Sequence, residues 1–125
     1  MKTYEFNPAL DQDYMAMNYA TDLGFCKALL EMFQQNVPLD VSQIKEAILL
    51  KDFDKVSSLA HKIKPSFKMV GLSQLSEGLV EVEMKAKSDG ESAILIFEKL
   101  LPKIEEGFIV IDDEIGKLTK CLEVR

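Results

Sequence analysis

The sequence predicts an all-α protein, an antiparallel up-and-down four-helix bundle with an additional N-terminal helix and a long, kinked C-terminal helix. The 125 residues include no Trp, four Pro and six Gly, and residues that favour helix, such as Leu, Glu, Lys and Met, are frequent. Apolar residues recur at helical spacings of three and four. No segment sustains the apolar–polar alternation that is typical of a half-buried strand. Short connections between long amphipathic helices favour antiparallel packing.

One domain is expected over residues 1–125, because domains cluster at about 100–150 residues. The hydrophobic content of 47% is enough for a core and excludes a disordered chain. No apolar stretch approaches the ~18 residues that cross a bilayer, and the N-terminus lacks the apolar run of a signal peptide. We therefore expect a cytoplasmic protein without a membrane segment.

Charge and cysteine spacing limit the partners. The net charge of −6 argues against nucleic acid, which would require a basic surface. Cys26 and Cys121 lie in apolar helical stretches and lack the close spacing of a metal knuckle or redox pair. We expect both to be small core or boundary residues.

Capping residues and a proline delimit the first helices. A short helix is expected near residues 11–20, with Asp11 near its start. Thr21 or Asp22 can cap a second helix, which Pro38 is expected to end. The predicted apolar stripe of this second helix comprises Phe25, Leu29, Met32 and Phe33.

Similar signals place the next two helices. Asp40 with Gln43 has the form of a capping box, which predicts a third helix, and Lys51-Asp52 begins a brief turn. A fourth helix is expected near residues 53–70, followed by Gly71 in a left-handed cap. The apolar residues of the third helix are Val41, Ile44, Ala47 and Ile48.

The turn Ser88-Asp89-Gly90 separates the last two helices. The fifth helix is expected near residues 73–87, with Leu75, Leu79, Val82 and Ala86 on one face. The final segment carries an apolar heptad seam, which predicts a long helix packed along other helices and kinked at Pro102. The seam comprises Phe97, Leu101, Ile104, Phe108, Ile111, Ile115, Leu118 and Leu122. It could pack within the bundle or partly against a second copy, although we expect a monomer.

The helix expected near residues 53–70 contains the candidate functional residues. At about 100° per residue, its apolar residues form one stripe, and His61, the single histidine, faces almost directly away from it. Lys64 and Lys68 follow His61 on the same exposed face. The predicted buried stripe comprises Val56, Leu59, Ala60, Ile63, Phe67 and Val70.

An exposed imidazole beside two ammonium groups suits phosphoryl transfer. Neutral imidazole is a nucleophile near neutral pH, and nearby positive charge favours this form. After phosphorylation, Lys64 and Lys68 can offset the negative charge. An ordinary surface histidine would give the same pattern. A triad-type base would require an orienting carboxylate, and positions i±3 and i±4 from His61 hold none. A metal site would require further ligands nearby.

A short motif adds to this pattern. The segment Ala60-His61-Lys62-Ile63-Lys64-Pro65-Ser66, followed by Val70-Gly71-Leu72, resembles the signature of the histidine-containing phosphotransfer (HPt) domain family of multistep two-component phosphorelays. The family pattern is His-x-x-Lys-Gly-Ser/Ala with a Gly-Leu pair further along the chain. The order of helices also matches, so the resemblance covers most of the sequence.

The resemblance implies roles for individual residues. By position, His61 would be the phosphoacceptor and Lys64 the side chain that steadies the phosphoryl group, while Lys68 adds positive charge to the docking face. Glu83 and Lys87 occupy the edge of the next helix, where the family often has polar or basic groups near the histidine. A surface salt bridge between these two residues at i, i+4 would account for them equally well.

Two further residues concern docking. Pro65 stands where the family usually has Gly; it is larger, and it removes the amide that would bond to the carbonyl of His61. We expect a kinked but continuous helix there, with the proline ring beside the imidazole and an effect on partner choice. Met69, at the edge of the exposed face, is either a docking residue or a packing residue of the bundle.

The resemblance also implies a reaction and its partners. The phosphoryl group would pass reversibly from a receiver phospho-aspartate to His61 and then to another receiver. The partners would be response-regulator receiver domains, a hybrid sensor histidine kinase, or both. The chain has no Gly-rich phosphate-binding loop, so we expect neither ATP binding nor autophosphorylation. No cofactor or metal is expected in this chain, and the receiver would supply magnesium.

Two alternatives stay open. A helical-bundle adaptor would bind signalling partners without phosphotransfer. A domain that a kinase phosphorylates directly, as in chemotaxis-type kinases, would carry the same exposed histidine. The lack of an attached catalytic or dimerisation segment, together with Met1 at the start, favours a free-standing carrier.

Overall fold

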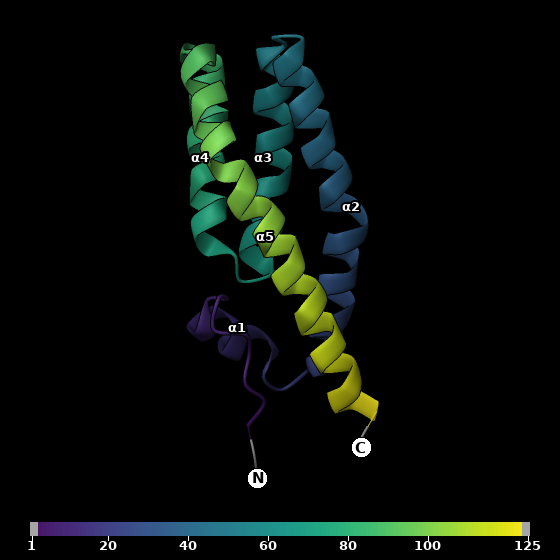
Figure 1. Cartoon of the computed structure of the whole chain (residues 1–125). Coiled ribbons are helices and arrows are strands. Elements are labelled where there is room, and N and C mark those ends of the chain that lie inside the picture. The colour runs from purple at the N-terminus through teal and green to yellow at the C-terminus, as the bar shows by residue number, and fades with distance from the viewer. Residues whose placement is uncertain (1–2, 124–125) are drawn as a thin grey trace.

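The computed structural model describes residues 3–123, which fold into five α-helices with no strand (Figure 1). The helices are α1 (Gln12–Tyr19), α2 (Leu23–Leu49), α3 (Phe53–Met69), α4 (Ser73–Ser88) and α5 (Gly90–Glu123). The predicted all-α class is confirmed.

Helices α2 to α5 pack as an up-and-down bundle. Each contacts its neighbours in chain order, α5 returns to contact α2, and the most extensive contact joins α3 to α4. The short α1 lies at the end of the bundle where both termini are found, below the α3–α4 turn in Figure 1. No helix in residues 3–123 is long and apolar enough to cross a membrane.

Four of the helices have an aspartate whose side chain caps the N-terminus. Each of these side chains accepts a hydrogen bond of 3.0–3.3 Å from a backbone N–H in the first turn of the helix that follows it. Such a cap typically contributes about 1 kcal/mol, because the first N–H groups of a helix lack partners within it. The capping residues are Asp11, Asp22, Asp52 and Asp89.

The prediction that Pro38 ends a helix is wrong. Helix α2 runs unbroken from Leu23 to Leu49 with Pro38 inside it. Proline in a helix interior costs about 3 kcal/mol. Val37 and Val41, one on each side of the proline, are both buried, and full burial of such a side chain contributes about 1.5–3 kcal/mol. Packing against the core therefore outweighs the lost hydrogen bond.

Asp40, for the same reason, is no capping residue. It lies within α2, where its buried carboxylate accepts a hydrogen bond of 3.1 Å from Nζ of Lys62 on α3. This pair ties α2 to the helix that carries His61.

The predicted stripe of α2 is confirmed for Phe33, which is buried, and for Leu29, which is partly buried against the core, but it is wrong for its other two members. Phe25 and Met32 are 52% and 56% exposed. Two adjacent faces of α2 carry apolar residues at helical spacing, so the periodicity of the sequence alone does not show which of the two rows of residues is buried. The positions of α3 and α5 on either side of α2 select the other row. Its buried members are Leu23, Cys26, Leu30, Phe33 and Val37.

Helix α5 is the longest helix, and its apolar face contributes to the core. It is continuous from Gly90 to Glu123 through Pro102. One half of the predicted seam is buried, and the other half is partly buried against the same core, so the seam packs within the bundle. The buried half comprises Phe97, Ile104, Ile111 and Leu118, and the partly buried half comprises Leu101, Phe108, Ile115 and Leu122. Cys26 and Cys121 are free, the first buried and the second half-buried, as predicted.

The turn between α3 and α4 requires glycine. Gly71 has φ +86°, the left-handed region that glycine adopts without strain. A Cβ atom there would lie 2.9 Å from Sδ of Met15. The backbone N–H of Leu72 donates to the carbonyl of Phe67 at 2.9 Å, which closes the helix end. The turn thus fixes how α4 folds back along α3, and the predicted left-handed cap is confirmed.

Substitution Gly71→Ala should therefore destabilise the protein by about 2 kcal/mol or more, because strain at positive φ adds to the clash with Met15. Urea unfolding followed by circular dichroism measures this. Gly116→Ala is a matched control, since a Cβ at Gly116 in α5 meets nothing within 4 Å. It should stabilise the helix by up to about 1 kcal/mol. Equal effects of the two substitutions would contradict the role assigned to Gly71.

Candidate functional site

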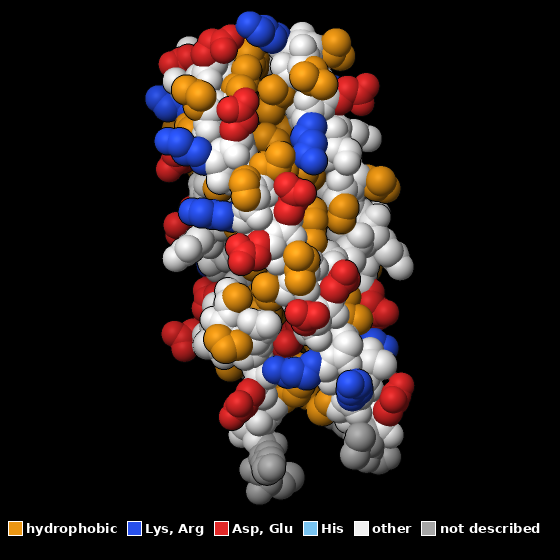
Figure 2. Space-filling view, in the orientation of Figure 1, with side chains coloured by type: hydrophobic (Ala, Val, Ile, Leu, Met, Phe, Trp, Pro, Cys, Tyr) orange, Lys and Arg blue, Asp and Glu red, His pale blue; other side chains and the backbone are white. Residues whose placement is uncertain are grey.

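His61 lies near the middle of α3, on the side of the helix away from the core. Its side chain is 66% exposed. The opposite side of α3 is buried, as predicted, through Val56, Leu59, Ala60, Ile63 and Phe67, with Val70 at the helix end. Figure 2 shows the face on which α5 lies in front, and no histidine is visible there. The imidazole therefore projects from another face of the bundle.

The carboxylate of Glu83, on α4, bridges two side chains of α3, those of His61 and Lys64. Nδ1 of His61 lies 2.8 Å from its Oε2, and Nζ of Lys64 donates to its Oε1 at 2.7 Å. The Glu83 side chain is 14% exposed. The hydrogen bond from Lys64, with that from His61, holds the pKa of the Glu83 carboxyl below its ordinary value. The carboxylate is therefore negatively charged at neutral pH.

This contact determines which ring nitrogen of His61 carries the proton. A carboxylate can only accept hydrogen bonds, so Nδ1 must be the donor at 2.8 Å. In the neutral ring the other nitrogen, Nε2, then keeps an unprotonated lone pair. Nε2 has no hydrogen-bond partner within residues 3–123, and the ring is mostly exposed. The arrangement presents a nucleophilic nitrogen to solvent.

The orienting carboxylate of His61 is not among its neighbours on α3, where a triad-type base would have it by sequence. It is Glu83 of the neighbouring helix α4. The sequence could have indicated Glu83. His61 and Glu83 lie equally far along the chain from Leu72 at the α3–α4 turn, so an antiparallel hairpin brings them level with each other. The alternative salt bridge from Glu83 to Lys87 is not formed. Glu83 instead pairs with His61 and Lys64.

The other predicted site residues lie around this centre. Lys68 is exposed one turn beyond Lys64, and its Nζ lies 5.5 Å from the ring centroid of Tyr14 on α1. Pro65 is exposed inside α3, which is continuous there as predicted. Met69 is 40% exposed. Lys87 is exposed on α4 and makes no ion pair with the described residues.

Exposed apolar side chains lie on α2 and near the C-terminal end of α3, about two helical turns beyond His61. A small cavity of about 110 Å³ lies between α2 and α3, with Met32 and Met69 among its lining residues. Phe25, also on α2, is exposed and contacts Tyr19 with ring centroids 6.2 Å apart. These side chains form an apolar surface near the C-terminal end of α3, on the same helix as His61 and Lys64.

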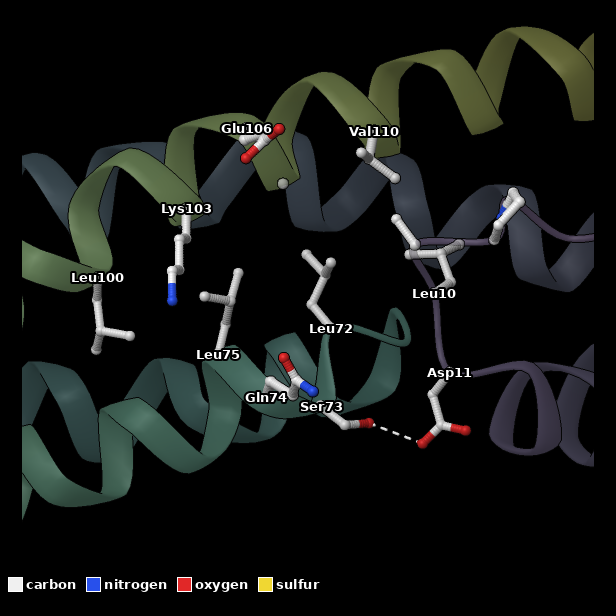
Figure 3. Close-up of a pocket in the computed structure, with 13 residues that line it drawn as sticks. Leu10, Asp11, Leu72, Ser73, Gln74, Leu75, Leu100, Lys103, Glu106 and Val110 are labelled. Atoms are coloured by element: carbon white, nitrogen blue, oxygen red, sulfur yellow. Dashed lines mark hydrogen bonds between the residues drawn. The ribbon is translucent and has the colours of Figure 1, made fainter.

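A larger cavity of about 620 Å³ lies elsewhere, between α4, α5 and residues 8–11. Leu72, Leu75 and Lys103 point into it, and Ser73 donates to Asp11 at 3.0 Å on its border (Figure 3). None of His61, Lys64 and Glu83 lines it. Residues 3–123 contain no cluster of three or more His, Cys, Asp or Glu side chains that could hold a metal ion.

Comparison with known proteins agrees with the geometry. The sequence matches the family described as Hpt domain over residues 28–118, a span that includes α3, α4, most of α2 and most of α5. Comparison with curated proteins and with solved structures found no match.

The charge of Glu83 predicts a pH-dependent contribution to stability. A carboxyl whose pKa is lowered in the folded state contributes stability above the ordinary Glu pKa of about 4.3, and that contribution is lost as the pH falls through the lowered value. The difference in unfolding free energy between wild type and Glu83→Gln should therefore be largest near neutral pH and shrink below about pH 4. Urea unfolding between acidic and neutral pH measures it. Glu77→Gln, on the exposed side of α4, is the control and should show no such trend; a constant difference for Glu83→Gln would contradict the ion pair.

Proposed function

The chain belongs to the Hpt domain family, and we propose that it relays a phosphoryl group between receiver aspartates through a phosphohistidine at His61, as a phosphocarrier in the cytoplasm. Hpt domains take part in histidine phosphotransfer within phosphorelays and interact with receiver domains. In this chain the reacting atom would be Nε2 of His61, and the whole chain would form one phosphotransfer domain.

One observation carries the proposal, the hydrogen bond between Nδ1 of His61 and the Glu83 carboxylate at 2.8 Å. It leaves Nε2 unprotonated on an exposed ring. A phosphoryl donor that is itself a protein must bring its active site onto the acceptor, so exposure of the nucleophile is a requirement. A buried histidine with the same neighbours could not serve.

The reaction needs little more than positioning and charge compensation. The lone pair of Nε2 attacks the phosphorus of a receiver aspartyl phosphate. A P–N bond forms, the P–O bond to the aspartate breaks, and the aspartate leaves as a carboxylate. The ring gains positive charge, which the Glu83 carboxylate opposite Nδ1 stabilises. Lys64, with Nζ beside the same carboxylate, can offset the negative charge of the phosphoryl group. Attack by a second receiver's carboxylate on phosphorus reverses these steps.

In this proposal the chain is a phosphocarrier and has no ATP-dependent kinase activity of its own. The divalent cation that phosphoryl transfer uses would come with the receiver. The chain contributes a fixed nucleophile, and the chemistry is completed by the partner's acidic pocket.

Docking would use the apolar surface near the C-terminal end of α3, beyond His61 on the same helix. Met32, Met69 and Phe25 are exposed there, and Lys68 and Pro65 lie between them and the histidine on α3. A small apolar contact beside a charged centre suits a weak complex that releases quickly. Transfer that is slower in Met69→Glu but unchanged in Leu49→Glu, at the 83% exposed far end of α2, would support this surface. Equal rates would contradict it.

Substitution His61→Gln should abolish phosphoryl acceptance, since no other histidine is present. The assay incubates the protein with a receiver phosphorylated on aspartate by a small phosphodonor, and follows label that is labile in acid and stable in base. Wild type should accept label within minutes, and His61→Gln should accept none.

Circular dichroism should show the same helix content for both proteins, because His61 is exposed and does not contact the core. Wild-type protein that binds receivers without accepting label would overturn the proposal in favour of an adaptor. Equal labelling of His61→Gln would place the phosphoryl group on another residue.

A further inference from the structure

Two hydroxyl groups link α3 to α4 on either side of the candidate site. Oγ of Ser57 on α3 donates to the backbone carbonyl of Glu83 at 3.1 Å. Oγ of Ser76 on α4 donates to the backbone carbonyl of Lys64 at 2.8 Å. The two bonds cross between the helices in opposite directions.

Each bond ends on the backbone of a residue whose side chain belongs to the site. Ser57 is only 3% exposed, and a buried hydroxyl needs an acceptor, but many carbonyls along an adjacent helix could serve. The acceptors used here are those of Glu83 and Lys64. The two bonds therefore fix the position of α4 along α3 at Glu83 and Lys64, whose side chains contact each other between the helices.

The bridge made by Glu83 depends on that position. Its two carboxylate oxygens lie 2.8 Å from Nδ1 of His61 and 2.7 Å from Nζ of Lys64. A shift of one residue along a helix moves the backbone by about 1.5 Å, which would carry either contact beyond hydrogen-bonding distance. Small displacements would thus release His61, Lys64 or both.

Pro65 makes such displacement easier at this point. Proline cannot donate to the carbonyl four residues before it, and that residue is His61. Helix α3 therefore lacks one internal hydrogen bond in the turn that runs from His61 to Pro65. The bond from Ser76 is made to Lys64, the residue immediately before the proline. This bond links to α4 the turn of α3 that lacks a backbone hydrogen bond because of Pro65.

We propose that Ser57 and Ser76 are positioning residues, which hold α3 and α4 in the register that lets Glu83 orient the ring of His61 and contact Lys64 across the turn containing Pro65. Neither hydroxyl touches the reacting atoms. Their effect on phosphoryl transfer rests on the proposed function, whereas their effect on the ring of His61 does not.

The test measures the tautomer of His61 directly. Because the chain has one histidine, long-range ¹H–¹⁵N correlation spectra of the neutral ring report the ratio of the Nδ1–H to the Nε2–H form without ambiguity. Wild type should show predominantly Nδ1–H. In Ser57→Ala/Ser76→Ala that ratio should fall several-fold, and phosphoryl acceptance should slow by about tenfold, as expected for a misplaced reacting group.

Two controls separate positioning from a general loss of stability. Thr119→Ala removes a hydroxyl that donates to the carbonyl of Ile115 at 2.8 Å within α5, and it should leave the tautomer ratio unchanged. Ser76→Thr keeps the hydroxyl and should retain the wild-type ratio. If the double variant does not fold by circular dichroism, the single variants are compared in the same way. An unchanged ratio in folded Ser57→Ala and Ser76→Ala would overturn the proposal.

The part played by Pro65 is tested by coupling. Pro65→Ala restores the missing N–H, so Ser76→Ala should change the tautomer ratio less in this background than in wild type. Equal changes in the two backgrounds would overturn the link to the proline. If wild type accepts no phosphoryl group, the proposed function fails, but the tautomer ratios still decide whether Ser57 and Ser76 position the ring.

Discussion

The hydrogen bond from His61 to Glu83 joins two helices, so it depends on everything that sets the α3–α4 hairpin. The turn at Gly71 folds α4 back along α3, and the crossing hydroxyl bonds fix the position of one helix along the other. The buried stripe of α3 aims the imidazole away from the core. A carboxylate shared by an imidazole and an ammonium group is the result. The rest of the bundle holds this pair of helices in place.

The fold was largely predictable because local signals agreed with one another. Aspartate caps, the glycine at the α3–α4 turn and the apolar stripe of α3 each have a physical cause that acts within a few residues. The failures concern α2, where local and tertiary effects compete. Pro38 is a helix breaker by local chemistry, and burial of its neighbours overrides it. Phe25 and Met32 form a plausible stripe by spacing, but the helices that flank α2 select another row.

The site was predictable in part. The exposure of His61 and Lys64 follows from a helical wheel of one helix, whereas the roles expected for them came from the resemblance of the motif to the Hpt domain family. Glu83 comes from the next helix, and its role depends on the register of the hairpin, which no local pattern encodes. For Pro65, the residue is evident from the sequence but its surroundings are not. Its identity is plain in the sequence, whereas the bond from Ser76 beside it is visible only in the structure.

The central claim is that Nε2 of His61 accepts the phosphoryl group while Nδ1 keeps its proton against Glu83. The most direct test is heteronuclear NMR of protein carrying ¹⁵N-labelled histidine after phosphorylation by a receiver. The account predicts ³¹P–¹⁵N coupling to Nε2 and a protonated Nδ1. Phosphorus bonded to Nδ1, or no phosphorus–nitrogen bond, would contradict it.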